Sequence, residues 1–279
     1  MSKDMDDIAE RSVYTEGWNG ATKQGKFFKR LEKVKSEGKL ISSAIRFGRG
    51  KIKSTEWNFI KFLIRVKNYL YPGKFLVGGK EFKYFINKYN SINTERTIEI
   101  PLVKAFINEN EHFVILEIGN VTSHYFSFPH DIVDKYEIEK GVINEDASVF
   151  KSNKKYDLIV SISTIEHIGY DEVVKDDTKI LRTLENLASC LKEHGKMVIT
   201  VPLKYNPIMD KIVIRNEFPF NEILFLKRVS RLNRWVESTM EESTISMYGK
   251  KYPAANSIAL LIYEKKEKVP QRETLQMLN

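Results

Sequence analysis

From about residue 95 onward, hydrophobic residues form alternating strand-like and helix-like segments. Nearly unbroken β-branched runs are typical of strands buried on both faces, and apolar residues three or four positions apart are typical of helices. The strand-like runs span 113–120, 130–134, 141–147, 156–163 and 195–202, and the helical spacing spans 95–110 and 175–192. Strands separated by helices in this way predict an α/β fold with a mostly parallel sheet.

The chain before residue 90 has a different pattern. Residues 57–71 predict a helix that is apolar over most of its circumference. Aromatic and β-branched runs on either side of Gly78 and Gly79 predict a β-hairpin over 73–86. We therefore expect a helical and hairpin N-terminal extension over 1–90 and an α/β domain over 91–279.

Composition narrows the class of protein. With 279 residues, 42% of them hydrophobic, the chain can bury a full-sized core. The single cysteine excludes disulfide scaffolds and cysteine-rich zinc sites, and no metal is expected. No apolar run reaches the roughly 18 residues that cross a bilayer, and the first residues are acidic. These features predict a cytoplasmic protein.

Positive charge is concentrated in the first third of the chain. The net charge is +8, yet residues 1–90 hold 20 Lys and Arg against 9 Asp and Glu. The densest segment, 26–53, has ten basic and two acidic residues. One interpretation is a helix packed on the main domain with its lysines reaching water. The other is a peripheral membrane or polyanion contact through residues 26–71.

Acids and glycine follow the expected strands at the ends where parallel sheets bind ligands. Glu117 and Gly119 end the first strand, Asp134 ends the second and Asp146 ends the third. A carboxylate accepts strong charge-assisted hydrogen bonds from two hydroxyls at once, and glycine lets backbone approach a ligand closely. The pattern favours one polar ligand lying across several strand ends.

Together with the segment SISTIEHI at 161–168, this series resembles the class I S-adenosylmethionine-dependent methyltransferases over about 105–265. The resemblance implies a Rossmann-like sheet of about seven strands, with 256–266 as a late antiparallel strand. It also implies S-adenosylmethionine as cofactor, and a narrower resemblance is to small methyltransferases of sugar and glycan pathways. The implied cofactor-binding residues are Glu117, Gly119 and Asn120 beside the methionine part, Asp134 at the ribose, Asp146 and Ala147 at the adenine, and Ser163 beside the methyl group.

Each assignment has an alternative. Glu117 is either part of the cofactor site or a structural capping acid, Asp131 competes with Asp134, and Glu145 competes with Asp146. His167 is either a general base or an orienting, packed histidine. Arg96 either binds the cofactor carboxylate or forms a surface ion pair. Four further candidates are expected near cofactor or substrate: His124, Tyr125, Tyr205 and Asn206. Tyr84 and Tyr89 are expected either in a lid over the cofactor or as packed aromatics of the hairpin.

Two features depart from the family pattern. Val121 occupies the position where a second glycine is usual. Only the segments 120–129 and 135–140 join the first three strands, whereas a parallel crossover usually needs a dozen residues or more. Either the first helices are reduced to a turn or the expected strand edges are misplaced.

The sequence also excludes several chemistries. It contains no GxGxxG dinucleotide fingerprint, Walker loop or HExxH zinc motif. The favoured function is O-methylation of a hydroxyl on a sugar, glycan or other small acceptor. An RNA methyltransferase that grips its substrate through 26–53 is one alternative, although no RNA-binding motif accompanies the charge. A cofactor-binding protein without turnover is the other.

Overall fold

The structure is a computed structural model that describes residues 55–68, 70, 73–87, 91–109 and 112–267. The basic segment 26–53, on which the RNA hypothesis depends, lies outside the described residues. The predicted N-terminal helix is present over 55–68 and 70. The predicted hairpin is confirmed: β1 (Lys74–Val77) pairs antiparallel with β2 (Lys80–Lys83), and the two glycines between them adopt positive φ.

The main sheet has the order β5-β4-β3-β6-β7-β10-β8-β9. Its strands are β3 (Ile115–Ile118), β4 (Asp131–Val133), β5 (Val142–Ile143), β6 (Tyr156–Ile162), β7 (Leu191–Pro202), β8 (Glu222–Arg228), β9 (Trp235–Ser238) and β10 (Ser257–Glu264). The first five are parallel, and β10 runs antiparallel to both of its neighbours. This mixed, mostly parallel sheet confirms the predicted Rossmann-like α/β fold. It has eight strands because β9 adds an antiparallel edge to β8.

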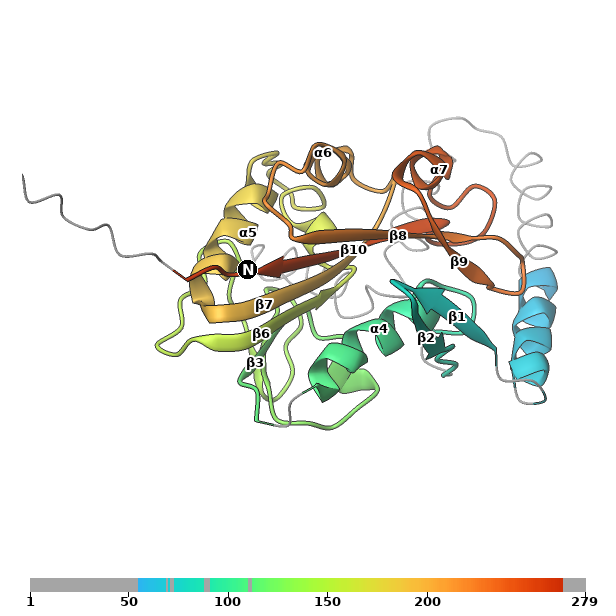
Figure 1. Cartoon of the computed structure of the whole chain (residues 1–279), viewed down its shortest axis with the longest axis horizontal. Helices are drawn as coiled ribbons and strands as arrows, with labels where there is room; N and C mark the ends of the chain where they lie inside the picture. Colours follow the sequence, from blue (N-terminus) through green and yellow to red (C-terminus); the bar gives the residue numbers. More distant parts are fainter. Residues whose placement is uncertain (1–54, 69, 71–72, 88–90, 110–111, 268–279) are drawn as a thin grey trace, which may run out of the picture.

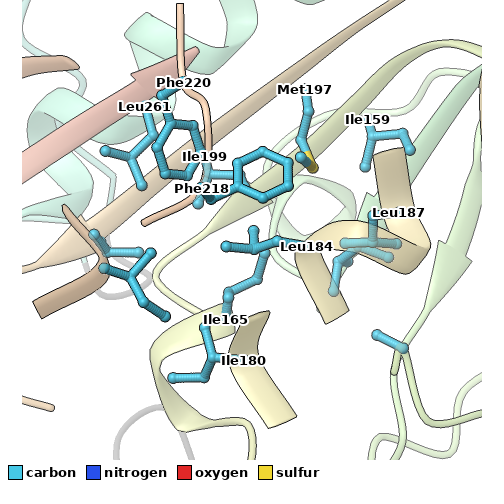
Figure 2. Close-up of a cluster of buried hydrophobic side chains, with 14 of the residues drawn as sticks. Ile159, Ile165, Ile180, Leu184, Leu187, Met197, Ile199, Phe218, Phe220 and Leu261 are labelled. Atoms are coloured by element: carbon cyan, nitrogen blue, oxygen red, sulfur yellow. The ribbon is translucent and has the colours of Figure 1, made fainter. Parts of the chain in front are cut away.

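Helices cover both faces of the sheet (Figure 1). They are α4 (Arg96–Asn108), α5 (Lys179–Cys190), α6 (Pro207–Arg215) and α7 (Met240–Ile245). Alternate residues of the central strands face opposite layers, since strand side chains have a period of two. In β6, Ile159 packs in one cluster with α5 and α6, while Leu158 and Val160 pack in the other with α4. Figure 2 shows part of the first cluster, where Leu184 and Leu187 of α5 meet Met197 and Ile199 of β7.

The connections between the first parallel strands are unusually short. Between β3 and β4 the only helical piece is η1 (Thr122–His124), a single 3-10 turn. No helix lies between β4 and β5, over the described residues 134–141. The short connections are therefore explained by helices reduced to a turn or absent, and not by misplaced strand edges. The strands β4 and β5 are correspondingly short, with three and two residues.

The hairpin packs against the main domain across the predicted boundary at residue 90. Phe75 and Val77 are buried in the same cluster as Ile98 of α4. Tyr84 donates to the carbonyl of Trp235 and accepts from its amide, at 3.2 and 2.9 Å. Tyr84 is therefore a packed aromatic of the hairpin and not part of a lid. Tyr89 lies outside the described residues. Within the part of the chain that the structure covers, no helix combines the length and apolarity needed to cross a bilayer.

Candidate functional site

The loop after β3 begins with a turn that requires glycine. Gly119 has φ +84°, and a Cβ there would overlap the side chain of Thr164 in the loop after β6. Its amide donates to the carbonyl of Val133 in β4 at 2.9 Å. The missing side chain therefore lets three neighbouring strand ends approach closely, as a site for a ligand along this edge needs.

Glu117 shapes this loop from inside the protein. Its carboxylate is completely buried and accepts hydrogen bonds from the amides of Val121 and Thr122 at 2.9 and 2.7 Å. The Thr122 hydroxyl and His130 Nε2 also contact it, at 2.5 and 2.9 Å. The Glu117 side chain thus caps the loop after β3, which is the structural alternative that the sequence analysis gave for it. Only the backbone of 117–119 remains available to a ligand. Val121, at the position where the second glycine is usual, has φ −109°, a conformation that does not require glycine.

Asp134 lies at the same edge, directly after β4. Its Oδ1 accepts from the amides of Tyr136 and Glu137, both at 2.8 Å. Its Oδ2 faces the loop after β3, where the amide of Asn120 lies 3.4 Å away. One oxygen therefore fixes the carboxylate while the other has only a long contact. The rival Asp131 lies at the other end of β4.

Asp131 is engaged where it stands. It accepts from the hydroxyl of Tyr156 at 2.8 Å and pairs with Lys154 at 2.7 Å. Because β4 begins at this residue, its carboxylate belongs to the amino edge of the parallel strands. The structure thus places Asp134, and not Asp131, beside Gly119 and Asn120.

Asp146 after β5 belongs to a compact ion cluster. It accepts from the Ser148 amide and hydroxyl at 3.0 and 2.7 Å, and it pairs with Lys179 at 2.5 Å and Lys135 at 3.1 Å. Both lysines also pair with Glu172. Burial raises the pKa of Asp146, but the bonds from Lys179 and Ser148 outweigh it and hold the pKa well below its usual range. A ligand here would meet these paired charges; Ala147 is buried and Glu145 is exposed.

A histidine cluster lies at the ends of β6 and β7. His167 closes η2 (Ile165–His167), and its Nδ1 is hydrogen-bonded to Asp171. The Tyr205 hydroxyl donates to the same carboxylate at 2.5 Å and lies 3.2 Å from the imidazole. Burial lowers the pKa of His167, but the bond to Asp171 and the charge of Glu166 outweigh it and raise that pKa. The ring is oriented by a carboxylate, and 35% of the side chain stays exposed.

Glu166 is the unusual member of this cluster. Its side chain is 1% exposed, neither carboxylate oxygen has a hydrogen bond, and the Nε2 of His167 lies 3.5 Å from Oε1. Burial raises the pKa of Glu166 to about 8, against the opposing charge of His167. This carboxyl therefore keeps its proton to a higher pH than an ordinary glutamate does, and in the protonated form it can donate a hydrogen bond.

Arg96 and Ser163 meet on a buried glutamate of α4. Glu99 is completely buried and pairs with Arg96 Nη1 at 2.5 Å. The Ser163 hydroxyl donates to its other oxygen at 2.5 Å. Burial lowers the pKa of Arg96, but the charges of Glu99 and Glu95 outweigh this effect and raise that pKa. Arg96 thus forms an ion pair, as one of the alternatives expected, but a buried one.

The four predicted substrate residues are divided between two places. Tyr205 and Asn206 belong to the histidine cluster, because Asn206 caps α6 and its amide donates to the Glu166 carbonyl at 2.7 Å. His124 and Tyr125 follow β3: His124 lies 3.4 Å from Glu137, and Tyr125 packs edge-on against Phe85.

Sequence reasoning missed Glu99, Asp171 and Tyr248. A carboxylate between the apolar residues of 98–103 was a signal for Glu99, and the spacing of four residues from His167 was one for Asp171. Tyr248 carries no such signal, since it follows α7 in an irregular segment. Its ring packs 5.1 Å from that of Tyr205, and burial, with the charges of Glu95 and Glu166, raises its pKa.

No protein-family model matches the chain, and no curated protein matches it. Among solved structures, N-methyltransferase NodS from Bradyrhizobium japonicum WM9 is 14% identical, covering 62% of this chain and 97% of its own, with a TM-score of 0.39. A TehB-like S-adenosylmethionine-dependent methyltransferase from Corynebacterium glutamicum is 16% identical, covering 61% and 87%, with a TM-score of 0.38.

A third structure is a possible histamine N-methyltransferase from Thermotoga maritima, 13% identical over 60% of this chain and 88% of its own, with a TM-score of 0.36. All three are described as methyltransferases. A likeness at these identities concerns the fold alone. The strand order and directions of this chain describe that fold independently.

Proposed function

We propose that this protein is an S-adenosylmethionine-dependent methyltransferase whose cofactor lies across the carboxyl ends of β3 and β4. The observation that carries the proposal is the Asp134 carboxylate beside the loop of Gly119 and Asn120: its Oδ1 is fixed by two amides, and its Oδ2 makes only a long contact of 3.4 Å with the Asn120 amide. In parallel α/β sheets, ligands bind at this edge. A fixed carboxylate with one open oxygen suits a pair of ribose hydroxyls, and Gly119 leaves room for the methionine part.

The other half of the edge supports an acceptor site. When bound, the cofactor would supply a methyl group on a sulfonium, which is a good methyl donor because its sulfur leaves as a neutral thioether. The protein then has to align two molecules, which can contribute about 7–11 kcal/mol. His167, oriented by Asp171, would take the proton of the acceptor hydroxyl on Nε2, while the cofactor would supply the methyl group by cleavage of its methyl–sulfur bond and leave as S-adenosylhomocysteine. A positioned base of this kind contributes about 10²–10⁴-fold.

We favour a hydroxyl of a sugar, glycan or other small molecule as the acceptor. The paired His167 and Asp171 support this choice, because a hydroxyl must lose its proton during transfer and the unprotonated nitrogen of an oriented imidazole can accept it. Asp171 is a positioning residue, since it acts through the histidine. Arg96 and Ser163 hold Glu99 beneath this site and contribute to its shape.

An amine acceptor is a second candidate, favoured by Glu166. A buried carboxyl without hydrogen bonds attracts a cationic group, which would restore its charge. Tyr205 lies between the rings of Tyr170 and Tyr248, at 5.9 and 5.1 Å, and aromatic faces also favour cations. The two candidates differ in what His167 does, because a protonated amine must lose its proton before it attacks.

Methyl transfer from radiolabelled S-adenosylmethionine tests both acceptors. The protein would be incubated with matched panels of sugar hydroxyl acceptors and primary amines, with His167→Gln as the inactive control. Label on a hydroxyl supports the favoured acceptor, and label on amines alone contradicts it while leaving a methyltransferase. If the protein neither transfers label nor binds the cofactor in calorimetry, the whole proposal is wrong.

The peripheral membrane contact also remains a proposal, supported by helix 55–70. Phe59, Phe62 and Leu70 are exposed by 57–60% of their surface, and basic residues lie between them. Such a surface fits an anionic bilayer. Cosedimentation with anionic but not neutral vesicles, lost in Phe59→Ser/Phe62→Ser, is the expected result. Equal sedimentation of the variant would contradict it.

A further inference from the structure

A separate cavity of about 220 Å³ lies beside the hairpin, away from the strand ends described above. It is bounded by helix 55–70, the hairpin, the first turn of α4 and the segment between β8 and β9. Figure 1 shows helix 55–70 standing next to β1 at the edge of the molecule. The volume is below the roughly 300–1,000 Å³ of pockets for drug-sized ligands, so any occupant is small.

The charged residues that line this cavity are all basic. Lys67, Lys74 and Arg234 contribute to its wall, and among the described residues no acidic one lines it. Of these three side chains, Lys74 forms an ion pair with Glu81 at 2.5 Å. Like charges that share one concave surface repel each other, and a bound anion relieves that repulsion. The charge of the cavity therefore selects a negatively charged ligand.

A buried hydroxyl points to the same conclusion. Thr97 lines the cavity and is completely buried, and its Oγ1 has no hydrogen-bond partner among the described residues. An unsatisfied buried hydroxyl costs about 1–3 kcal/mol, a cost that an acceptor oxygen on a ligand would remove. Thr97 is also the second residue of α4, a helix of 13 residues, whose N-terminus favours negative charge.

Part of the lining of the cavity is apolar. Ile64, Ile86 and Leu232 line it, so the ligand has an uncharged part in addition to its anionic group. A simple inorganic ion would leave these side chains without a contact. Three basic side chains along one cavity match the multiple oxygens of a phosphate better than the two oxygens of a carboxylate.

We propose that this cavity is a second binding site, for a small organic molecule that carries a phosphate monoester. Lys67 and Arg234 hold the phosphate, Thr97 donates to one of its oxygens, and the apolar wall receives the rest of the molecule. The same chemistry is offered by a soluble sugar phosphate and by the headgroup of phosphatidic acid. This site depends on no residue of the proposed methyltransferase site.

Calorimetry with three probes tests the proposal: inorganic phosphate, glucose 1-phosphate, and phosphatidylcholine vesicles with or without phosphatidic acid. The test variant is Lys67→Gln/Arg234→Gln, and Thr97→Val removes the hydroxyl alone. The control is Lys80→Gln/Arg215→Gln, which changes the net charge equally outside the cavity. Thermal unfolding without ligand checks that each variant folds.

We expect saturable binding of glucose 1-phosphate, weakened about tenfold or more in the test variant and unchanged in the control. Phosphate should bind more weakly because it misses the apolar wall. Binding of phosphatidic acid vesicles alone, lost in the test variant and retained in Phe59→Ser/Phe62→Ser, would assign the site to a lipid headgroup. The proposal is overturned if no probe saturates, or if the control loses as much affinity as the test variant.

Discussion

The two halves of the carboxyl edge are built in different ways. At β3 and β4, backbone amides fix the polar groups: Asp134 accepts from residues two and three positions later, and Glu117 from residues four and five positions later. At β6 and β7, side chains hold one another, as in the contacts of His167 with Asp171 and of Ser163 with Glu99. The first half is local in sequence, and the second joins α4, η2 and the segment after β7.

This difference separates rigidity from reactivity. Short bonds from two backbone amides fix the Asp134 carboxylate in place, which is what a binding group needs. The side-chain cluster instead contains Glu166, whose pKa burial raises to about 8, and carboxyl groups displaced toward neutrality in this way are typical of acid–base chemistry. The comparison predicts that changes in the first half affect binding and that changes in the second affect turnover and pH dependence.

Replacement of the histidine should have the largest effect. We expect His167→Gln to lower kcat for a hydroxyl acceptor by about 10²–10⁴-fold, because the base is lost, with S-adenosylhomocysteine affinity unchanged. Initial rates of methyl transfer and calorimetry measure the two quantities. His194→Gln, at an exposed histidine, is the control. A His167→Gln enzyme that retains full kcat would remove the base from the mechanism.

Asp171→Asn tests the role of His167 through the pH dependence of kcat. Asp171 helps to raise the pKa of His167, so its loss lowers that pKa and moves the acidic limb of the kcat profile to lower pH. A purely structural role for Asp171 would reduce the rate without moving the limb. The pH profile of wild type and variant decides between these results.

Glu166 should make stability depend on pH. Its pKa is raised to about 8 when folded, so the folded state holds a proton that the unfolded state releases above about 4.5. The free energy of unfolding therefore falls as pH rises between these values, by up to about 1.4 kcal/mol per pH unit from this group. Glu166→Gln removes that contribution.

Urea unfolding at pH 5.5 and 7.5 measures this difference. The stability of Glu166→Gln relative to wild type should increase between the two pH values, by about 3 kcal/mol at most. Glu185→Gln, at an exposed position of α5, should show no such change. A difference that stays constant with pH would mean that Glu166 is ionised in the folded protein.

The glycine turn offers a steric test of the first half. Gly119 and Gly141 have similar φ, +84° and +91°, but only the first would place a Cβ against another side chain. We expect Gly119→Ala to lower the free energy of unfolding by about 1–3 kcal/mol more than Gly141→Ala, because the two share the backbone strain but not the overlap. Equal losses in urea unfolding would show that the loop yields to Thr164.

Local patterns predicted most of the fold. Continuous β-branched runs identified β3, β6 and β7, because a strand buried on both faces has no polar side. The strands β8 and β9 were missed, since EILFLKR and WVES mix charged and apolar residues and lie at the less covered end of the sheet. The reduction of the first helix to η1 followed from segment length alone.

The site was predictable only where it is local. Gly119 and Asp134 follow their strands directly, so the strand pattern found them. Glu99 and Tyr248 reach the histidine cluster from positions far along the chain, and only the folded structure brings them there. Asp146 was found by its place after β5, but its pairing with Lys179 depends on how α5 packs.

Calorimetry with S-adenosylhomocysteine tests the central claim, that Asp134 binds the cofactor at the edge of β3 and β4. Wild type, Asp134→Ala and Asp131→Ala would be compared, since the two acids lie at opposite ends of one short strand. We predict saturable binding to wild type and to Asp131→Ala, and at least about tenfold weaker binding to Asp134→Ala, as expected for a lost charge-assisted hydrogen bond. Equal affinity in all three proteins would contradict the account.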